Sequence, residues 1–163
     1  MTVAEYNSVV DQCADNLYRF LYKSVQDTDI AKDLVQDSFL KLWVNVRKLE
    51  LNGARKYLFT IGYHCMIDYF RKSQKVHFNS EELQNLSIEP ETNDLQELLQ
   101  LALNQLPQVQ KNLIMLRDYE GYNYQEISEI TGLSESQVKV YLFRARTALK
   151  NMLIKYNKIN PSV

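Results

Sequence analysis

The stretch from Asn123 to Lys150 constrains this chain more than any other, because it contains two helix starts separated by a short gap. Asn123 precedes Glu126 by three residues, and Ser134 precedes Gln137 in the same way. This spacing is typical of a capping box, in which each of two side chains binds the backbone amide of the other. The two pairs therefore predict two successive helices.

Between the two starts, Gly132 is placed to end the first helix, because a left-handed backbone costs little only for glycine. From Gln137 to Lys158 the chain has six basic residues and no acidic one. A tight turn followed by a basic helix predicts a helix-turn-helix, which lays its second helix in the major groove of DNA. The same arrangement also occurs in all-helical domains that never bind DNA. The second helix has one apolar stripe, made of Val138, Leu142, Ala145, Leu149 and Met152.

Composition narrows the remaining classes of protein. The 163 residues suffice for one ordinary domain or two small ones, and only 4 glycines and 3 prolines favour a mostly helical protein. Because the net charge is −1, any DNA binding must come from basic residues gathered on one surface. Cys13 and Cys65 lie far apart without paired histidines, which predicts reduced core thiols, no metal site and no cofactor. With neither a signal sequence nor a membrane-length apolar run, we expect a cytoplasmic protein without direct membrane insertion.

Apolar spacing predicts a first helix over Val3–Val25 and a second over Asp29–Trp43, capped by Thr28 or Asp29. One face of the second helix gathers small and apolar residues that must face the core. The opposite face mixes polar and large apolar residues, which is typical of a helix that docks on a basic partner. The alternative is that a neighbouring helix of the same domain covers its apolar members. This mixed face contains Asp33, Gln36, Asp37, Leu40, Trp43 and Val44.

A third helix is expected over Lys56–Lys75, after a loop at residues 45–56. Its outward residues combine aromatic and basic groups, which suits single-stranded nucleic acid because bases stack on rings and phosphates attract cations. His64 and Cys65 form no catalytic dyad, since neighbours in a helix point about 100° apart. The outward set is Tyr57, Thr60, His64, Ile67, Asp68 and Arg71, and the helix ends in Arg71, Lys72 and Lys75.

Residues 80–104 contain six acidic residues and no basic one, which predicts an acidic linker that becomes helical near Leu95–Leu103. A further helix begins at Pro107 and leads to the helix-turn-helix. The sequence thus predicts an all-α protein with two small helical domains, at 1–76 and 105–163, joined by a linker at 77–104. In the free chain we expect the acidic linker to compete with DNA for the basic surfaces, so that DNA binding without a partner is weak.

Three segments, in this order, resemble bacterial RNA polymerase sigma factors of the extracytoplasmic-function group, which belongs to the sigma-70 family. DIAKDLVQDSFLKLW resembles the polymerase-docking helix of that family, and KYLFTIGYHCMIDYFRK resembles its helix for promoter melting and minus-ten recognition. LPQVQKNLIMLRDYEGYNYQEISEITGLSESQVKVYLFRARTALK resembles its C-terminal domain, which reads the minus-thirty-five element. The resemblance spans nearly the whole chain except the linker.

The resemblance implies that Asp33, Gln36, Asp37, Leu40 and Trp43 bind the coiled-coil clamp of the largest polymerase subunit. It places the capture of a flipped base at the loop Arg47–Arg55, and it implies promoter DNA contacts elsewhere. This family usually has asparagine at the position of His64, and basic residues at those of Thr60 and Tyr63. The residues that the resemblance and the outward pattern assign to DNA are Tyr57, His64, Asp68, Arg71, Lys72, Ser136, Lys139, Val140, Phe143 and Arg144.

The resemblance implies an assembly factor and not an enzyme. Its partners would be bacterial core RNA polymerase, promoter DNA with minus-ten and minus-thirty-five elements, and an anti-sigma factor. A response-regulator activator would need an α/β receiver domain, and a site-specific recombinase would need arginines clustered around a serine or tyrosine nucleophile. The N-terminal half has neither pattern.

Overall fold

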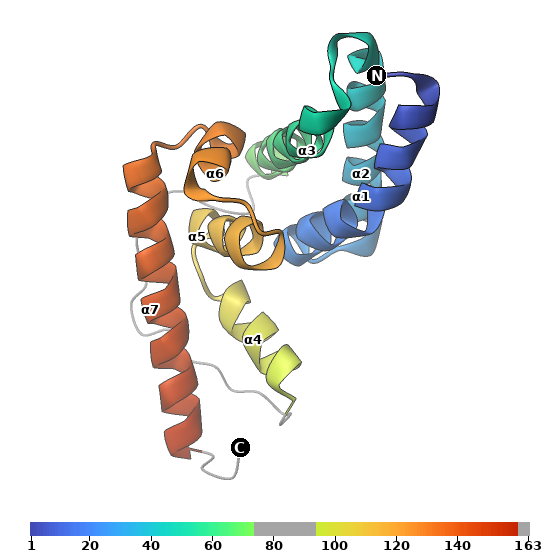
Figure 1. Ribbon diagram of the computed structural model, residues 1–163. Helices are drawn as coiled ribbons and strands as arrows, with labels where there is room; N and C mark the ends of the chain where they lie inside the picture. The colour runs from blue at the N-terminus through green and yellow to red at the C-terminus, as the bar shows by residue number, and fades with distance from the viewer. Residues whose placement is uncertain (74–93, 160–163) are drawn as a thin grey trace.

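The computed structural model describes residues 1–73 and 94–159, and within these ranges every regular element is a helix. The prediction of an all-α fold is therefore confirmed. Figure 1 shows the N-terminal helices on one side of the molecule and the C-terminal helices on the other. The elements are α1 Val3–Val25, α2 Thr28–Val44, the 3₁₀ turn η1 Val46–Lys48, α3 Leu51–Ser73, α4 Leu95–Asn104, α5 Gln108–Ile114, the π-helical turn η2 Met115–Tyr119, α6 Tyr124–Thr131 and α7 Glu135–Ile159.

The N-terminal unit consists of α1, α2 and α3 packed around one apolar core. The predicted bounds of α1 are confirmed, and Thr2 caps it through a capping box with Glu5. The expected cap of α2 was wrong by one or two residues. Asp27 has an extended backbone, and its side chain accepts a hydrogen bond from the Ile30 amide, so Asp27 is the cap.

The third helix begins at Leu51, five residues before the predicted start. The loop expected at residues 45–56 is thus a 3₁₀ turn followed by the first turn of α3. Gly53 lowers the helix propensity of this turn by about 1 kcal/mol. Ala54 and Leu58 are fully buried on the core side of the same helix, and this burial outweighs the glycine.

The C-terminal unit contains the predicted helix-turn-helix, formed by α6 and α7. Asn123 and Glu126 form a reciprocal capping box at the start of α6, and Gly132 ends that helix at φ 80°. Ser134 and Gln137 bind each other's backbone amides at the start of α7. Of the predicted apolar stripe, Leu149 is partly exposed and four residues are buried, namely Val138, Leu142, Ala145 and Met152.

The acidic linker was predicted to extend to residue 104, with a helix near its end. That helix is α4, and Leu98, Ala102 and Leu103 are buried on it, where it packs against α7. By its contacts α4 thus belongs with the C-terminal helices. The linker's acidic residues at 81, 82, 89 and 91, and Lys75, lie outside the described residues.

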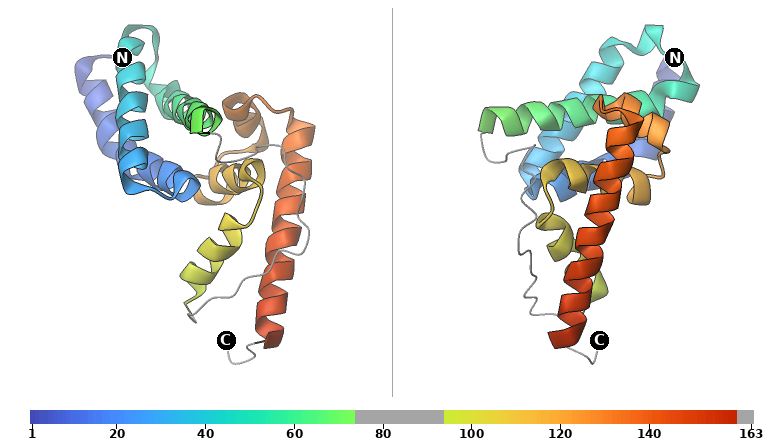
Figure 2. Two further views of the ribbon diagram at one scale, coloured as in Figure 1. Left: turned by 180° about the vertical axis from the view of Figure 1, so that it is seen from behind. Right: turned by 90° about the vertical axis from the view of Figure 1, so that its left-hand side faces the viewer.

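The two units pack directly on each other. Helix α6 lies along α3, and α5 contacts α1, as the views in Figures 1 and 2 agree. Aromatic rings continue the core from one unit to the other: Phe20 of α1 meets Phe59 of α3, whose ring meets Tyr122 edge-on at 5.5 Å between centroids. We call this contact between the units the seam. The sequence alone had left the relative placement of the units open.

Candidate functional site

The mixed face of α2 is exposed to solvent. Asp33, Gln36 and Asp37 are exposed, and so are Leu40 at 62% and Trp43 at 41%. No helix of the described chain covers Leu40, whereas the Trp43 ring rests edge-on against Tyr6 of α1 at 4.9 Å. The alternative, in which a neighbouring helix covers Leu40 and Trp43, is therefore wrong for Leu40. For Trp43 it holds only on the side of the ring that faces Tyr6.

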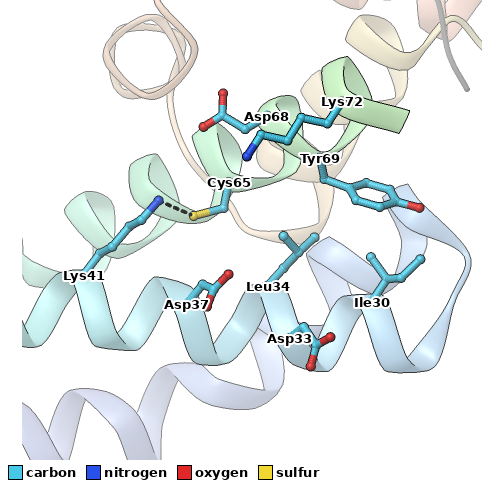
Figure 3. A pocket seen from close by; sticks show the side chains of 9 residues that line it. All are labelled: Ile30, Asp33, Leu34, Asp37, Lys41, Cys65, Asp68, Tyr69 and Lys72. Carbon is cyan, nitrogen blue, oxygen red and sulfur yellow. Dashed lines mark hydrogen bonds between the residues drawn. The ribbon is translucent and has the colours of Figure 1, made fainter. Parts of the chain in front are cut away.

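A pocket of about 340 Å³ lies between α2 and α3 (Figure 3), next to Asp33 and Asp37 of the mixed face and Asp68 of the outward set. Lys41 of α2 and Cys65 of α3 point toward each other across it, and the Lys41 ammonium donates a hydrogen bond to the thiol sulfur at 3.3 Å. Carboxylates assigned to polymerase and groups assigned to DNA thus share one pocket. Its lining residues are Ile30, Asp33, Leu34, Asp37, Lys41, Cys65, Asp68, Tyr69 and Lys72.

Most of the residues that the sequence assigned to DNA on α3 are exposed. His64, Asp68, Arg71 and Lys72 are exposed, while Tyr57 is partly buried. Arg71 forms an exposed ion pair with Asp68 at 3.6 Å. Residues four apart are neighbours on a helix surface, so Lys56, Thr60, His64, Asp68 and Lys72 form a row that winds about 160° around α3 at about 100° per residue. We call this the α3 row.

All five residues assigned to DNA on the recognition helix α7 are exposed near its start. Phe143 is 72% exposed and Val140 46%, which leaves both apolar side chains available for contact. The Lys139 ammonium lies 5.8 Å from the centre of the Tyr124 ring of α6. Further along α7, Arg146 is bound to Asp118 at 2.9 Å, and this hydrogen bond raises the pKa of Arg146. The five residues are Ser136, Lys139, Val140, Phe143 and Arg144.

Sequence reasoning missed a cluster of charges at the seam. Glu120 follows η2, its side chain is 1% exposed, and it accepts hydrogen bonds from Arg19 at 2.8 Å and Arg55 at 3.2 Å. The Arg55 guanidinium also stacks 4.7 Å from the centre of the Tyr122 ring, and burial strongly raises the pKa of that phenol. No local pattern marks this cluster, because Arg19, Arg55 and Glu120 are far apart in sequence.

A second ion pair joins Lys56 of α3 to Glu129 of α6, and both side chains are partly exposed. Polar contacts also join α1 to α5, where Ser24 donates to the Asn112 side chain at 3.2 Å. In the described residues, no group of His, Cys, Asp and Glu side chains is arranged to hold a metal ion. Among the helices of the described ranges, none has the length and apolar character needed to cross a membrane.

In the described ranges, an all-helical fold with an exposed basic helix-turn-helix is typical of DNA-binding transcription proteins, and comparison with known proteins specifies the family. Residues 9–76 match the family model of sigma-70 region 2, and residues 96–149 match that of sigma-70 region 4. The chain is 31% identical to RNA polymerase sigma factor SigV of Bacillus subtilis, covering 86% of each chain. It is 29% identical to the ECF RNA polymerase sigma factor SigM of the same organism, covering 97% of each.

The fold also matches the crystal structure of the sigma factor RpoE bound to the anti-sigma factor NepR from Bartonella quintana. The TM-score is 0.70 at 27% identity, covering 93% of this chain and 98% of RpoE. The chain belongs to the sigma-70 family of RNA polymerase sigma factors, in the extracytoplasmic-function group. It is therefore a transcription initiation factor and not an enzyme, as the resemblance implied.

Proposed function

We propose that this sigma factor docks on core RNA polymerase in the cytoplasm through the mixed face of α2. The observation that supports this most directly is the exposure of Leu40 and Trp43 beside three polar residues, since apolar anchors among carboxylates suit a basic partner. The carboxylates of Asp33 and Asp37 would set the register and speed encounter, while Leu40 and Trp43 would be buried by the partner.

We propose in addition that α3 and α7 read the minus-ten and minus-thirty-five elements. On α3, His64 and Asp68 would contact the unpaired strand, while Tyr57 would stack on a base and Arg71 and Lys72 would attract phosphates. On α7, Ser136 and Lys139 would contact base edges and Arg144 a phosphate, with Val140 and Phe143 against thymine methyl groups. Two weak contacts held at a fixed spacing by polymerase act together as one strong contact.

This function requires the two units to separate. The two elements lie about 25 base pairs apart, which is about 85 Å of duplex at 3.4 Å per pair. Helix α6 contacts α3 and continues through a short turn into α7, so the two reading helices lie much closer than that. The packed arrangement is thus a form of the free chain, and the polymerase-bound form would be open. An anti-sigma factor is proposed as a further partner, since the similar sigma factor RpoE was crystallised in complex with the anti-sigma factor NepR.

The test is transcription in a purified system. Core polymerase from a bacterium is mixed with this protein and fragmented genomic DNA, the bound DNA is sequenced, and enriched fragments become templates. We expect transcripts that start downstream of a shared pair of sequence elements and that depend on both proteins. If the protein does not direct core polymerase to any start site, the proposal is wrong. If the protein alone binds the same fragments tightly, a stand-alone repressor or activator is the better reading.

A further inference from the structure

We propose that two carboxylates of the C-terminal unit, Glu120 and Glu129, occupy cations that the N-terminal unit needs for promoter DNA. The chain would then restrain its own DNA binding until the seam opens. This inference rests on the proposed function and concerns the regulation of the same α3 surface. It assigns the restraint to two carboxylates at the seam, one buried and one at the exposed rim, and separate from the acidic linker.

The first pair of charges lies deep in the seam. The Glu120 carboxylate receives Arg19 on one oxygen at 2.8 Å and Arg55 on the other at 3.2 Å, and Arg55 also donates to the Glu120 backbone carbonyl at 3.3 Å. Arg55 comes two residues before Tyr57, at the end of the segment where the family resemblance implies capture of a flipped base. The Arg55 side chain is still 40% exposed, but its guanidinium is engaged by Glu120 and by the Tyr122 ring, so a phosphate would have to compete with both.

The second pair lies at the rim. Lys56 is the first member of the α3 row that continues through His64 and Asp68, and Glu129 of α6 binds its ammonium. A carboxylate on this ammonium takes the place that a phosphate oxygen would take, because both are anionic acceptors of charge-assisted hydrogen bonds. The two pairs together thus neutralise neighbouring cations on successive residues of α3.

Two buried aromatic residues, Phe59 and Tyr63, lie one turn apart on the same helix, and Phe59 is at the seam. Tyr63 is 7% exposed, although its position is among those that the family resemblance assigns to basic residues near DNA. Its neighbour along the helix, Phe59, packs against Tyr122. An aromatic side chain suits this buried position, whereas a basic one would be desolvated there.

The seam also has features of a contact that can reopen. The hydroxyl of Tyr122, Nε of Arg19 and Nδ2 of Asn112 are buried without a hydrogen-bond partner in the protein. Buried polar groups without partners oppose closure, since water would satisfy them in the open form. The charges favour the closed form and the unsatisfied groups favour the open one, so the balance can be shifted by a partner.

The consequence can be measured as an apparent affinity. If only the open form binds DNA, the apparent dissociation constant equals the intrinsic constant divided by the open fraction. Removing one carboxylate of the seam raises the open fraction and releases a cation at the same time. Both effects strengthen DNA binding by the free protein.

The experiment uses the full chain without polymerase and a fluorescein-labelled single-stranded DNA of random sequence, with fluorescence anisotropy as the readout at low salt. Glu120→Gln keeps the shape of a fully enclosed side chain and removes its charge. Glu129→Gln does the same at the partly exposed rim, where unfolding is not expected. The control is Asp11→Asn, which removes an equal charge from an exposed turn of α1 away from the seam. Small-angle scattering measures the radius of gyration of each variant, and thermal melting measures its folding.

We expect DNA affinity to rise about tenfold or more for Glu120→Gln and about threefold for Glu129→Gln, in line with buried and exposed ion pairs. The radius of gyration should rise for Glu120→Gln, and Asp11→Asn should change neither quantity appreciably. Equal gains in all three variants would mean that only net charge matters, and the inference would be wrong. It would also be wrong if both seam variants bind DNA as weakly as the wild type.

Should Glu120→Gln fail to fold, Glu129→Gln alone decides, and no gain in DNA affinity for this folded variant overturns the inference. Transcription with core polymerase separates the two proposals. A wild-type protein that initiates transcription while neither seam variant gains affinity contradicts only the self-restraint. A wild-type protein that initiates nowhere contradicts the proposed function itself.

Discussion

Leu17 of α1 packs directly against Gly62 of α3 in the N-terminal unit. A Cβ atom added at Gly62 would lie 2.8 Å from Cδ1 of Leu17 and 3.6 Å from Oγ of Ser38. Leu17 and Ser38 are fully buried, so the leucine has little room to move. Three helices meet at this point because one of them has no side chain there.

We predict that Gly62→Ala destabilises the fold, while Gly53→Ala does not. Both glycines are in α3, and alanine has the better helix propensity by about 1 kcal/mol. At Gly53 nothing lies within 4 Å of the added atom, whereas at Gly62 overpacking costs about 1–3 kcal/mol. Urea denaturation should therefore separate the two variants by about 1–3 kcal/mol, with Gly62→Ala the less stable. Equal stability of both variants would show that Leu17 moves aside freely.

A second prediction concerns Lys111, which is 4% exposed. Burial, and to a smaller extent the charge of Lys23, lowers the pKa of Lys111 from 10.5 to about 8. The folded state therefore releases its proton at a lower pH than the unfolded state, so the cost of the buried charge is full below pH 8 and disappears between pH 8 and 10.5. Lys111→Met should remove this cost, which is about 3 kcal/mol. Denaturation at several pH values should show the advantage of the variant shrinking as pH rises through this window.

The matched control for that experiment is Lys32→Met, which changes an exposed lysine of α2. It removes one amine without relieving any burial, so its stability relative to the wild type should not follow the same pH trend. If both variants show the same trend, the pH dependence does not come from Lys111.

The docking proposal predicts that Leu40→Asp weakens polymerase binding and leaves the fold intact. Leu40 is 62% exposed, so the substitution disturbs no core contact, whereas loss of a buried interface anchor costs about 2 kcal/mol, or about thirtyfold in affinity. Titration of labelled core polymerase measures this change, and circular dichroism measures helix content. Ile154→Asp, an exposed apolar residue at the far end of α7, is the control and should bind as the wild type does. Loss of helix content in Leu40→Asp would show that the residue belongs to the core.

On the recognition helix, Arg144→Ala should lower affinity for every promoter and reduce the dependence of binding on salt, as expected for a phosphate contact. Substitution of Ser136 or Lys139 should instead change which minus-thirty-five sequence is preferred. Competition binding of holoenzyme to a library of minus-thirty-five variants, repeated at three salt concentrations, distinguishes these roles. An Arg144→Ala protein with an unchanged salt slope and an altered sequence preference would reverse the two assignments.

Patterns within a single helix were predicted well from the sequence. The capping boxes at Asn123 and Ser134, the glycine turn and the bounds of α1 depend on residues a few positions apart, and the structure has them as predicted. The exposed Leu40 could be inferred because a helix must place it opposite its buried residues. The early start of α3 was missed because Gly53 weakens the local signal, while the burial that offsets it comes from other helices.

The seam could not be predicted, because it depends on residues that no period connects. Arg19 and Glu120 are 101 positions apart, and Arg55 and Glu120 are 65 apart. A carboxylate that is 1% exposed has the same appearance in a sequence as one that is solvated. The buried and the solvated carboxylate are distinguished only by the packing of the two units on each other, and that packing is a property of the folded chain as a whole.

The buried Glu120 has a consequence for how this protein can evolve. If Arg55 binds a promoter phosphate once the seam is open, as proposed above, it serves two anions in turn, and a change in Arg55 that strengthens its contact with one would strengthen its contact with the other. The affinity for promoter DNA and the restraint of DNA binding in the free protein would then change together. To change one without the other, a substitution must fall on a residue that contacts Arg55 in only one of the two states, and Glu120 is the simplest such position.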